Sequence, residues 1–135
     1  GGVTIPFDRG LLGHSDADVL AHAVVDALLG AAAAGNIGEH FPCTEEFRGI
    51  SSIELLKRTK KIISHKGYDI ANIDSTVVMQ QPRLAPYIDD MRKNIAQALG
   101  IDAEAVSVKA KTTEGMGFEG RGEGVSAMAS AALVR

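Results

Sequence analysis

One stretch of the chain, residues 13–38, combines a helical pattern with a regular series of chemically active side chains. It reads GHSDADVLAHAVVDALLGAAAAGNIG, and its imidazoles and carboxylates recur at every fourth position: His14, Asp18, His22 and Asp26. Residues four apart lie on one face of a helix, so this spacing predicts a helix with a polar stripe. With Ser15 as N-cap and Asp18 as the acidic member of a capping box, we expect the helix to run from about Asp16 to Leu29.

Two interpretations of this stripe remain open at this point. Two imidazoles and two carboxylates beside an apolar face outline a metal or phosphate site. Alternatively, the acidic side chains only complement the helix dipole, and a histidine at the helix start only hydrogen-bonds to a loop. The rest of the chain has to decide between them.

Composition excludes several classes of function. The chain has 135 residues, enough for one domain with its own core. A net charge of −3 gives no electrostatic basis for binding nucleic acid or an anionic membrane. No apolar run approaches transmembrane length. The single cysteine, Cys43, cannot form an internal disulfide, which fits a reducing compartment.

Helical and strand patterns alternate along the chain. Besides the first helix, a capping box at Ser51 and Glu54 predicts a second helix that ends at Gly67. The other predicted segments, in order, are the end of a strand in Gly1–Pro6, a surface loop in Gly38–Gly49, a strand over Tyr68–Met79, a polar loop between Pro82 and Pro86, a helix over about Pro86–Leu99 closed by Gly100, a strand over Ala105–Lys111, a glycine-rich loop in Gly115–Gly124 and a strand over Val125–Val134.

This order predicts an α+β domain in which helices cover one face of a mixed sheet. We expect the other face to be apolar and to be left for a partner subunit. The scarcity of large side chains, with aromatic residues at only 4%, points the same way, because such a domain gains buried surface by forming oligomers.

Three clusters in loops favour a phosphorylated substrate. His14 and Ser15 stand at a helix start, where free N–H groups attract an anion. The segment Lys111–Glu114, KTTE, ends a predicted strand and offers hydroxyl donors to phosphate, and its carboxylate suits Mg²⁺ bound to a diphosphate. The glycines that follow allow the backbone to approach a ligand closely.

Five segments carry a resemblance to a known family. They are GLLGHSDADVLAHA at Gly10–Ala23, DALLGAAA at Asp26–Ala33, GNIGEHFP at Gly35–Pro42, QQPRL at Gln80–Leu84 and KTTEGMGFEGRGEG at Lys111–Gly124. In these segments, and in their order, the chain resembles the 2-C-methyl-D-erythritol 2,4-cyclodiphosphate synthases of the non-mevalonate isoprenoid pathway. The resemblance extends over nearly the whole chain and describes a single domain.

The resemblance implies a fold, an assembly and a reaction. The fold is chorismate-mutase-like or ferredoxin-like, in a homotrimer whose central core meets the uncovered sheet face and whose active sites lie between subunits. In 4-diphosphocytidyl-2-C-methyl-D-erythritol 2-phosphate, the 2-phosphate attacks the β-phosphate, a cyclic diphosphate forms and CMP leaves. The resemblance implies Zn²⁺ and either Mg²⁺ or Mn²⁺ as cofactors, neither a nucleic acid nor a membrane partner, and a location in the bacterial cytoplasm or the plastid stroma.

The resemblance also assigns roles to individual residues. It implies that His22 is a zinc ligand, that Glu114 binds Mg²⁺ or Mn²⁺, and that His14 and Thr112 stabilise the transition state. Asp18 and Asp26 are better suited to helix contacts and to orienting the imidazoles. The implied substrate contacts are Ser15 at phosphate; Asn36 and Gly38 near the ribose; Phe41, Pro42, Cys43, Thr44 and Glu45 in a mobile loop; Met79, Gln80, Gln81, Pro82, Arg83, Leu84 and Ala85 around the cytosine; Lys111 and Thr113; and Phe118 and Arg121 in a cavity on the trimer axis that can hold an isoprenoid diphosphate.

The chain departs from the family pattern in two ways. The other two zinc ligands belong to a D-x-H motif on a strand that would precede Gly1, so we expect this chain to lack a complete zinc site and one sheet strand. Asn36 stands where the family has aspartate, so we expect a modest loss of affinity. His40 and His65 are interpreted as a loop residue and a helix-end residue, and Cys43 has no visible activating partner.

Two other functions are therefore kept as alternatives. The first is a trimeric module that binds cytidine nucleotides or isoprenoid diphosphates and is inactive because its zinc site is incomplete. The second gives the polar stripe only a structural role, in which case alanine at His14 or Glu114 would leave nucleotide affinity unchanged.

Overall fold

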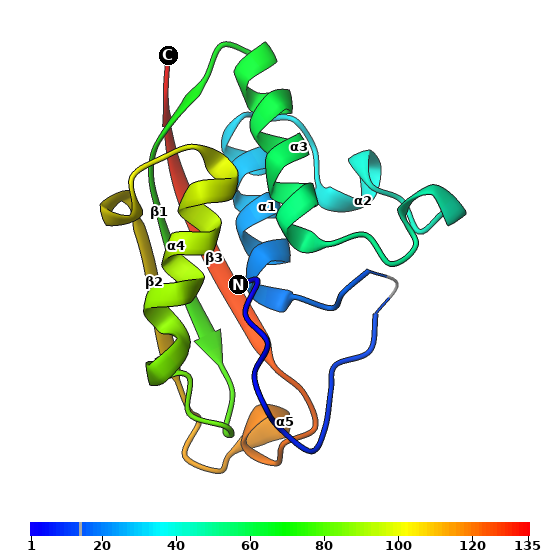
Figure 1. Ribbon diagram of the computed structural model, residues 1–135, viewed down its shortest axis with the longest axis vertical. Helices are drawn as coiled ribbons and strands as arrows, with labels where there is room; N and C mark the ends of the chain where they lie inside the picture. The colour runs from blue at the N-terminus through cyan, green and yellow to red at the C-terminus, as the bar shows by residue number, and fades with distance from the viewer. Residues whose placement is uncertain (14) are drawn as a thin grey trace.

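The sheet is built around its central strand, β1 (Asp69–Val78), in a computed structural model that describes residues 1–13 and 15–135. Within these residues, β1 pairs in parallel with β2 (Val106–Lys111) and antiparallel with β3 (Ser126–Val134), giving the order β2-β1-β3 (Figure 1). Val78 lies opposite both Lys111 and Ser126. The C-terminal ends of β1 and β2 and the start of β3 therefore lie at the same end of the sheet, and the loops that follow β1 and β2 begin side by side.

Alternation of side chains explains why the strands bury one face. Ile73, Ser75 and Val77 of β1 are buried, and so are Val106 and Val108 of β2. Side chains at every second position of a strand point to the same face, so these five side chains meet the helices together. The three strands predicted from the sequence at Tyr68–Met79, Ala105–Lys111 and Val125–Val134 are confirmed within one or two residues at each end.

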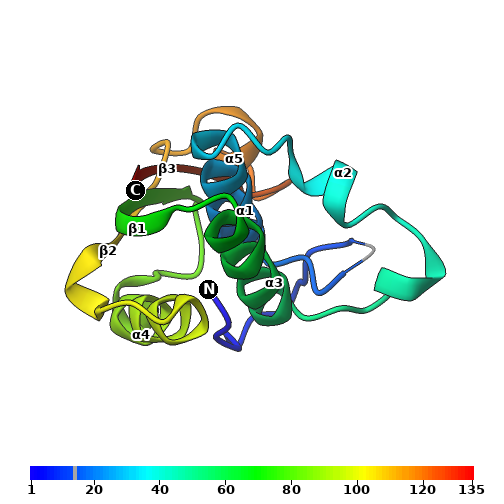
Figure 2. The ribbon, with the colours of Figure 1, turned by 90° about the horizontal axis from the view of Figure 1, so that it is seen from above.

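Three long helices cover the buried face of the sheet. Helices α1 (Val19–Ala31) and α4 (Ile88–Leu99) pack on the strands, and α3 (Ser52–His65) packs on both of them (Figures 1 and 2). Leu28, Leu56 and Ile95, one from each helix, are fully buried in the common core. The predicted α+β class, a mixed sheet with helices on one face, is confirmed.

The ends of α3 and α4 follow from local sequence. Ser51 caps α3 by accepting a hydrogen bond of 3.1 Å from the N–H of Glu54, as its capping box predicted. Gly67 follows α3 with a φ of 86°, and Gly100 ends α4 with a φ of 66°. Glycine adopts this left-handed conformation without the steric penalty of a side chain, so both predicted helix stops are correct.

Three local predictions are wrong. Residues 1–6 form no strand in the structure. The first helix begins at Val19 rather than near Asp16, because Asp18 and not Ser15 caps it. The segment expected to be a plain loop contains α2 (Ile37–His40) and a 3₁₀ turn, η1 (Glu45–Phe47). The remaining short elements are η2 (Ala85–Tyr87), η3 (Ala103–Ala105) and α5 (Gly117–Gly120).

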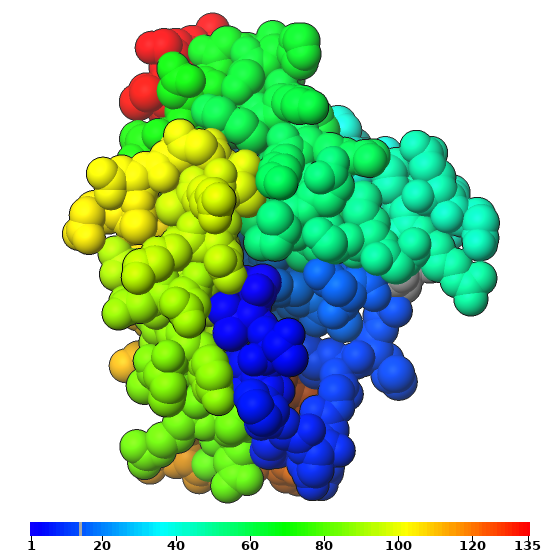
Figure 3. Space-filling model, viewed as in Figure 1, coloured from blue at the N-terminus to red at the C-terminus, as the bar shows by residue number. Residues whose placement is uncertain are grey.

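The N-terminal segment packs where α1, α3 and α4 meet, instead of joining the sheet. Figure 3 shows it lying in a shallow groove beside α4. Asn94 of α4 donates hydrogen bonds to the carbonyl groups of Gly1 and Gly2, at 3.3 and 3.1 Å. A Cβ at Gly1 would lie 2.6 Å from Met91 of α4, so the close approach requires glycine.

The uncovered face of the sheet is mixed rather than apolar. Met128 and Val134 of β3 are 62% and 52% exposed there, but Asp74 and Lys109 form an ion pair of 2.8 Å on the same face. The prediction of an apolar face is therefore wrong in its composition, although no described helix covers the face. None of the described helices has the length and hydropathy needed to cross a membrane.

Candidate active site

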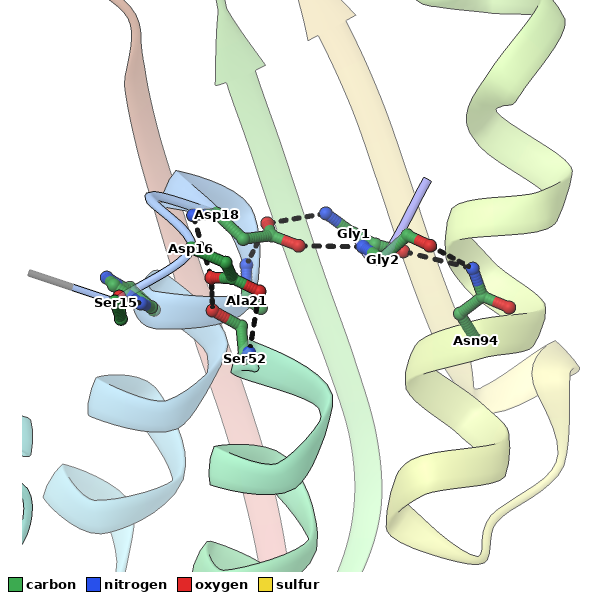
Figure 4. A network of polar contacts seen from close by, with 9 residues as sticks. Gly1, Gly2, Ser15, Asp16, Asp18, Ala21, Ser52 and Asn94 are labelled. Atoms are coloured by element: carbon green, nitrogen blue, oxygen red, sulfur yellow. Dashed lines mark hydrogen bonds and ion pairs between the residues drawn. The ribbon is translucent and has the colours of Figure 1, made fainter. Parts of the chain in front are cut away.

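The segment that leads into α1 is held by two aspartates (Figure 4). Oδ1 of Asp18 accepts a hydrogen bond of 3.1 Å from the N–H of Ala21 and lies 2.5 Å from the backbone nitrogen of Gly1, while Oδ2 accepts one of 2.7 Å from the N–H of Gly2. Asp18 thus has the structural role that the sequence favoured for it.

This segment brings two of the predicted site residues together. Oγ of Ser15 lies 3.0 Å from Nε2 of His22, near the start of α1. His14, the third residue of this predicted cluster, lies outside the described residues. Asp26, one turn further along α1, accepts a hydrogen bond of 2.7 Å from the N–H of Ile37 and so fixes the start of α2. The stripe is therefore divided: His22 faces Ser15, and the two aspartates bind backbone.

Ser15 and His22 line a cavity of about 400 Å³ that is otherwise mostly apolar. Three further residues predicted to contact substrate, Gly38, Phe41 and Cys43, also line it. The sequence did not reveal its apolar lining, which comes from separate segments: Leu11, Leu12, Ala17, Val19, Ile37, Phe47, Ile50, Leu55 and Val125. Such a cavity suits a ligand with a hydrocarbon part and a polar end.

A second, smaller cavity of about 210 Å³ lies where β1 and β2 end. Arg83 and Lys111, both exposed, give it two positive charges, so it favours an anionic ligand. All but one of the residues predicted to surround the cytosine line this cavity, which also includes Thr112: Met79, Gln80, Pro82, Arg83, Leu84 and Ala85. Gln81, the exception, is exposed beside it.

The loop after β2 is tied to the second cavity. The N–H of Gly115 donates a hydrogen bond of 3.2 Å to Oε1 of Gln80, and the N–H of Glu114 donates one of 3.3 Å to Oγ1 of Thr112. Thr113 donates from its hydroxyl to the carbonyl of Met116. Glu114 has a φ of 55°, which is uncommon for a residue other than glycine. Its carboxylate is exposed at the end of the sheet where β1 and β2 end.

The remaining predicted site residues line neither cavity. Oδ1 of Asn36 caps α2 by accepting a hydrogen bond of 3.0 Å from the N–H of Glu39. Pro42, Thr44 and Glu45 are exposed in the segment between α2 and α3, where Glu45 pairs with Arg48 at 3.5 Å.

Two other residues, Phe118 and Arg121, were predicted to line a cavity on the trimer axis. Phe118 is 46% exposed. Arg121 pairs with Glu123 at 2.8 Å, and this hydrogen bond and charge raise the pKa of Arg121 and lower that of Glu123.

His65 occupies the helix-end position expected of it, whereas His40, expected in a loop, is the last residue of α2. Nε2 of His40 lies 2.6 Å from the carbonyl oxygen of Ala34, and His65 belongs to the last turn of α3.

The two implied metals fit the described residues differently. Glu114 is a single exposed carboxylate, which is sufficient for Mg²⁺ because that ion commonly keeps one or two protein carboxylates and takes substrate phosphates as further ligands. A catalytic zinc ion needs three protein ligands. Among the residues that the structure describes, no three His, Cys, Asp or Glu side chains are placed to hold a metal ion, so His22 alone does not make a zinc site.

Sequence and structure both have close relatives. The sequence profile of the YgbB family matches residues 1–134. The 2-C-methyl-D-erythritol 2,4-cyclodiphosphate synthase of Lachnospira eligens is 60% identical over 134 residues, which are 98% of this chain and 73% of the relative. The bifunctional IspDF of Campylobacter jejuni has a TM-score of 0.93 and 44% identity, covering 98% of this chain and 36% of the other. IspF of Plasmodium falciparum, solved as a CDP complex, has a TM-score of 0.81 and 35% identity, covering 91% and 74%.

These matches extend over nearly the whole chain and agree with the resemblance carried by its motifs. They also agree with the observed fold, since the two solved relatives match 98% and 91% of this chain in structure. The prediction made from the sequence is confirmed: the chain belongs to the YgbB family, together with relatives named 2-C-methyl-D-erythritol 2,4-cyclodiphosphate synthase.

Proposed function

We infer that this chain converts 4-diphosphocytidyl-2-C-methyl-D-erythritol 2-phosphate to 2-C-methyl-D-erythritol 2,4-cyclodiphosphate and CMP. Family membership carries the inference, because relatives with 60% and 55% identity bear the name of that synthase. The second cavity supports it, since the residues predicted to surround a cytosine line it beside two cations. A relative of the same fold binds CDP.

The reaction is an intramolecular phosphoryl transfer, which makes the enzyme a phosphorus–oxygen lyase. An oxygen of the 2-phosphate forms a bond to the β-phosphorus, the bond from that phosphorus to the bridging oxygen breaks, and CMP leaves with the bridging oxygen. Such a reaction needs little covalent participation from the protein. It needs the substrate folded back on itself, an in-line approach and compensation of negative charge.

The chain's own residues can be assigned to these tasks. In this scheme the second cavity holds the cytosine, and Arg83 and Lys111 attract the phosphates beside it. Thr112 donates a hydrogen bond to the transferring phosphoryl group. At the other end of the substrate, Ser15 donates to a phosphate, and the apolar cavity receives the methylerythritol carbon chain.

Glu114 is the proposed ligand of Mg²⁺ or Mn²⁺. When bound there, the ion would neutralise charge on the diphosphate. Zn²⁺ at His22 is proposed as a second cofactor, but no step above depends on it, because its remaining ligands are not found among the described residues. Metal analysis of the purified protein decides both assignments.

A homotrimer is the proposed assembly. The uncovered sheet face, with exposed Met128 and Val134, supports it, and a trimer would bring the two cavities of neighbouring chains together. An isoprenoid diphosphate near Phe118 and Arg121 is proposed for the cavity on its axis. The bacterial origin of the relative from Lachnospira eligens supports a cytoplasmic location.

Measuring CMP release tests the function. The chain is incubated with the diphosphocytidyl substrate, Zn²⁺ and Mg²⁺, and Glu114→Gln is compared with the matched variant Glu104→Gln, a remote carboxylate that is 88% exposed. We expect release by the wild type and by Glu104→Gln, and a loss of about 100-fold or more in Glu114→Gln. If a folded wild type binds CDP but releases no CMP, the nucleotide-binding alternative is correct and the proposed reaction is wrong.

A further inference from the structure

Asp16, a carboxylate that the proposed chemistry leaves unused, lies between Ser15 and the first turn of α3 (Figure 4). Its Oδ2 accepts a hydrogen bond of 2.8 Å from the backbone N–H of Ser52. Its Oδ1 accepts one from the Ser52 hydroxyl and one of 3.2 Å from the N–H of Asp18. Both oxygens of Asp16 are therefore engaged, and Ser52 binds both.

The anchor on α3 is rigid. Ser52 is 0% exposed and is the first residue of a helix of 14 residues. The N–H groups of a first helical turn have no acceptor within the helix, and the helix dipole favours a negative charge there. Asp16 supplies both the acceptor and the charge, so the contact is favourable at both partners.

The backbone around Asp16 has no regular structure of its own to hold it. α1 begins only at Val19, and Ala17 has a φ of 56°, a left-handed conformation that an alanine adopts at a steric cost. The conformation of residues 15–18 therefore depends on the side-chain contacts made there. Those of Asp16 reach α3, 36 residues further along the chain.

Ser15 and Asp16 together join two helices. Ser15 contacts His22 of α1 at 3.0 Å, and the next residue contacts Ser52 of α3. Ser15 and Asp16 are consecutive residues joined by one peptide bond, so a displacement of Asp16 also moves Ser15.

We propose that Asp16 is a positioning residue, which holds Ser15 against His22 by binding the N-terminus of α3. Asp16 touches neither the substrate nor a metal in this arrangement, and it acts through Ser15. The proposal rests on the function proposed above for Ser15 and His22. It adds a residue whose loss misplaces the phosphate-binding end of the site while leaving the cytosine cavity intact.

Four variants test the proposal: Asp16→Asn, Ser52→Ala, the double variant, and Ser51→Ala as matched control. Asp16→Asn replaces one acceptor oxygen by an NH₂ donor, so one of the two hydrogen bonds donated by Ser52 loses its acceptor, and the negative charge at the start of α3 is removed. Ser51→Ala removes the N-cap of the same helix, a bond of 3.1 Å to the N–H of Glu54, without touching Asp16. For each variant we measure kcat and KM for CMP release, Kd for CDP, thermal stability, and the ¹H–¹³C NMR signals of the His22 imidazole.

We expect Asp16→Asn and Ser52→Ala each to lower kcat by about 10- to 100-fold, because small displacements in a positioned site have effects of that size. The Kd for CDP should stay within about twofold, and the double variant should be no slower than the slower single variant, since both substitutions weaken the same contact between Asp16 and the first turn of α3. The His22 signals should shift in all three. Ser51→Ala should lower the Tm but keep the wild-type kcat and His22 signals.

Wild-type kcat and unshifted His22 signals in Asp16→Asn would overturn the proposal, as would losses that multiply in the double variant. The NMR comparison does not need turnover. If the wild type released no CMP, the proposed function would fail, yet a shift of the His22 signals in Asp16→Asn but not in Ser51→Ala would still establish the positioning contact, and its absence would still refute it.

Discussion

Replacing Gly120 by alanine disturbs the loop that carries Glu114 through a single methyl group. A Cβ at Gly120 would lie 2.3 Å from the carbonyl carbon of Gly115 and 2.7 Å from Oγ1 of Thr113, whereas ordinary van der Waals contact begins at 3.4 Å. The backbone of Gly115 must therefore move by about 1.1 Å, the difference between 3.4 and 2.3 Å. Gly115 directly follows Glu114, and a shift of this size would break the hydrogen bond that its N–H donates to Gln80.

The size of the effect follows from this displacement. Overpacking of this kind costs about 1–3 kcal/mol in the free energy of unfolding. A shift of about 1 Å in a positioned catalytic group lowers turnover by about 100-fold. We expect Gly120→Ala to show both losses, measured by urea denaturation and by CMP release at saturating Mg²⁺.

Gly30→Ala provides the matched control. Gly30 lies in the last turn of α1, and nothing stands within 4 Å of the position that its Cβ would occupy. The same substitution should therefore raise the free energy of unfolding there, by about 0.5–1 kcal/mol, because alanine favours helix. Wild-type stability and turnover in Gly120→Ala would show that the loop yields freely and that the packing of α5 does not position Glu114.

Further predictions concern the core and the acid stability of the sheet. Thr59 is fully buried in α3 and donates to the carbonyl oxygen of Leu55 at 2.8 Å; Thr59→Val should change the free energy of unfolding by less than about 1 kcal/mol, because that carbonyl keeps its helical N–H partner. Leu56→Ala, in the same helix, should cost about 2–5 kcal/mol in the same denaturation measurement. Asp74 has its pKa lowered by the hydrogen bond from Lys109, so its carboxylate stabilises the fold above its unfolded-state pKa, and this contribution is lost as the pH falls through the lower, folded-state pKa. Asp74→Asn should therefore lose less stability than the wild type between about pH 5 and pH 2; an unchanged acid profile would mean that the pair with Lys109 does not contribute.

Patterns that depend on neighbours in the sequence were enough to predict most of the fold. Strand alternation in β1 and β2, the capping box of Ser51 and the stop at Gly100 each involve residues within one or two turns of one another. The same holds for the motifs that identify the family. Residues whose role is set by a local backbone pattern are accessible from sequence.

The start of α1 could not be predicted in this way. By sequence alone, Ser15 fits the N-cap position of a capping box and Asp18 fits its acidic position, whereas in the structure Asp18 is the N-cap. The positions of Ser15 and Asp18 depend on two contacts with distant residues. Ser52 donates a hydrogen bond to the intervening Asp16, and Gly2 donates one to Asp18. Those partners approach only in the folded chain, and their contacts hold residues 15–18 outside the helix.

The first cavity escaped prediction for a related reason. Leu11, Ile50 and Val125 belong to three segments with no shared periodicity, and each alone is an ordinary apolar residue. Only the packing of the N-terminal segment and the start of β3 near α1 makes them one surface. Motifs of polar residues can be recognised in a sequence, whereas the apolar residues that line a site have no such pattern.

The pairing of the first helix with the last strand has a consequence for synthesis of the protein. α1 packs on β3, and β3 forms an edge of the sheet beside β1 (Figure 1). On the ribosome, α1 and β1 emerge long before Ser126–Val134, so until then the apolar face of α1 and one edge of β1 have no partner. The domain therefore completes its folding only after the last strand has left the exit tunnel. A nascent chain that stalls before Ser126 exposes this apolar face and an unpaired strand edge, which makes it prone to aggregation and a substrate for chaperones.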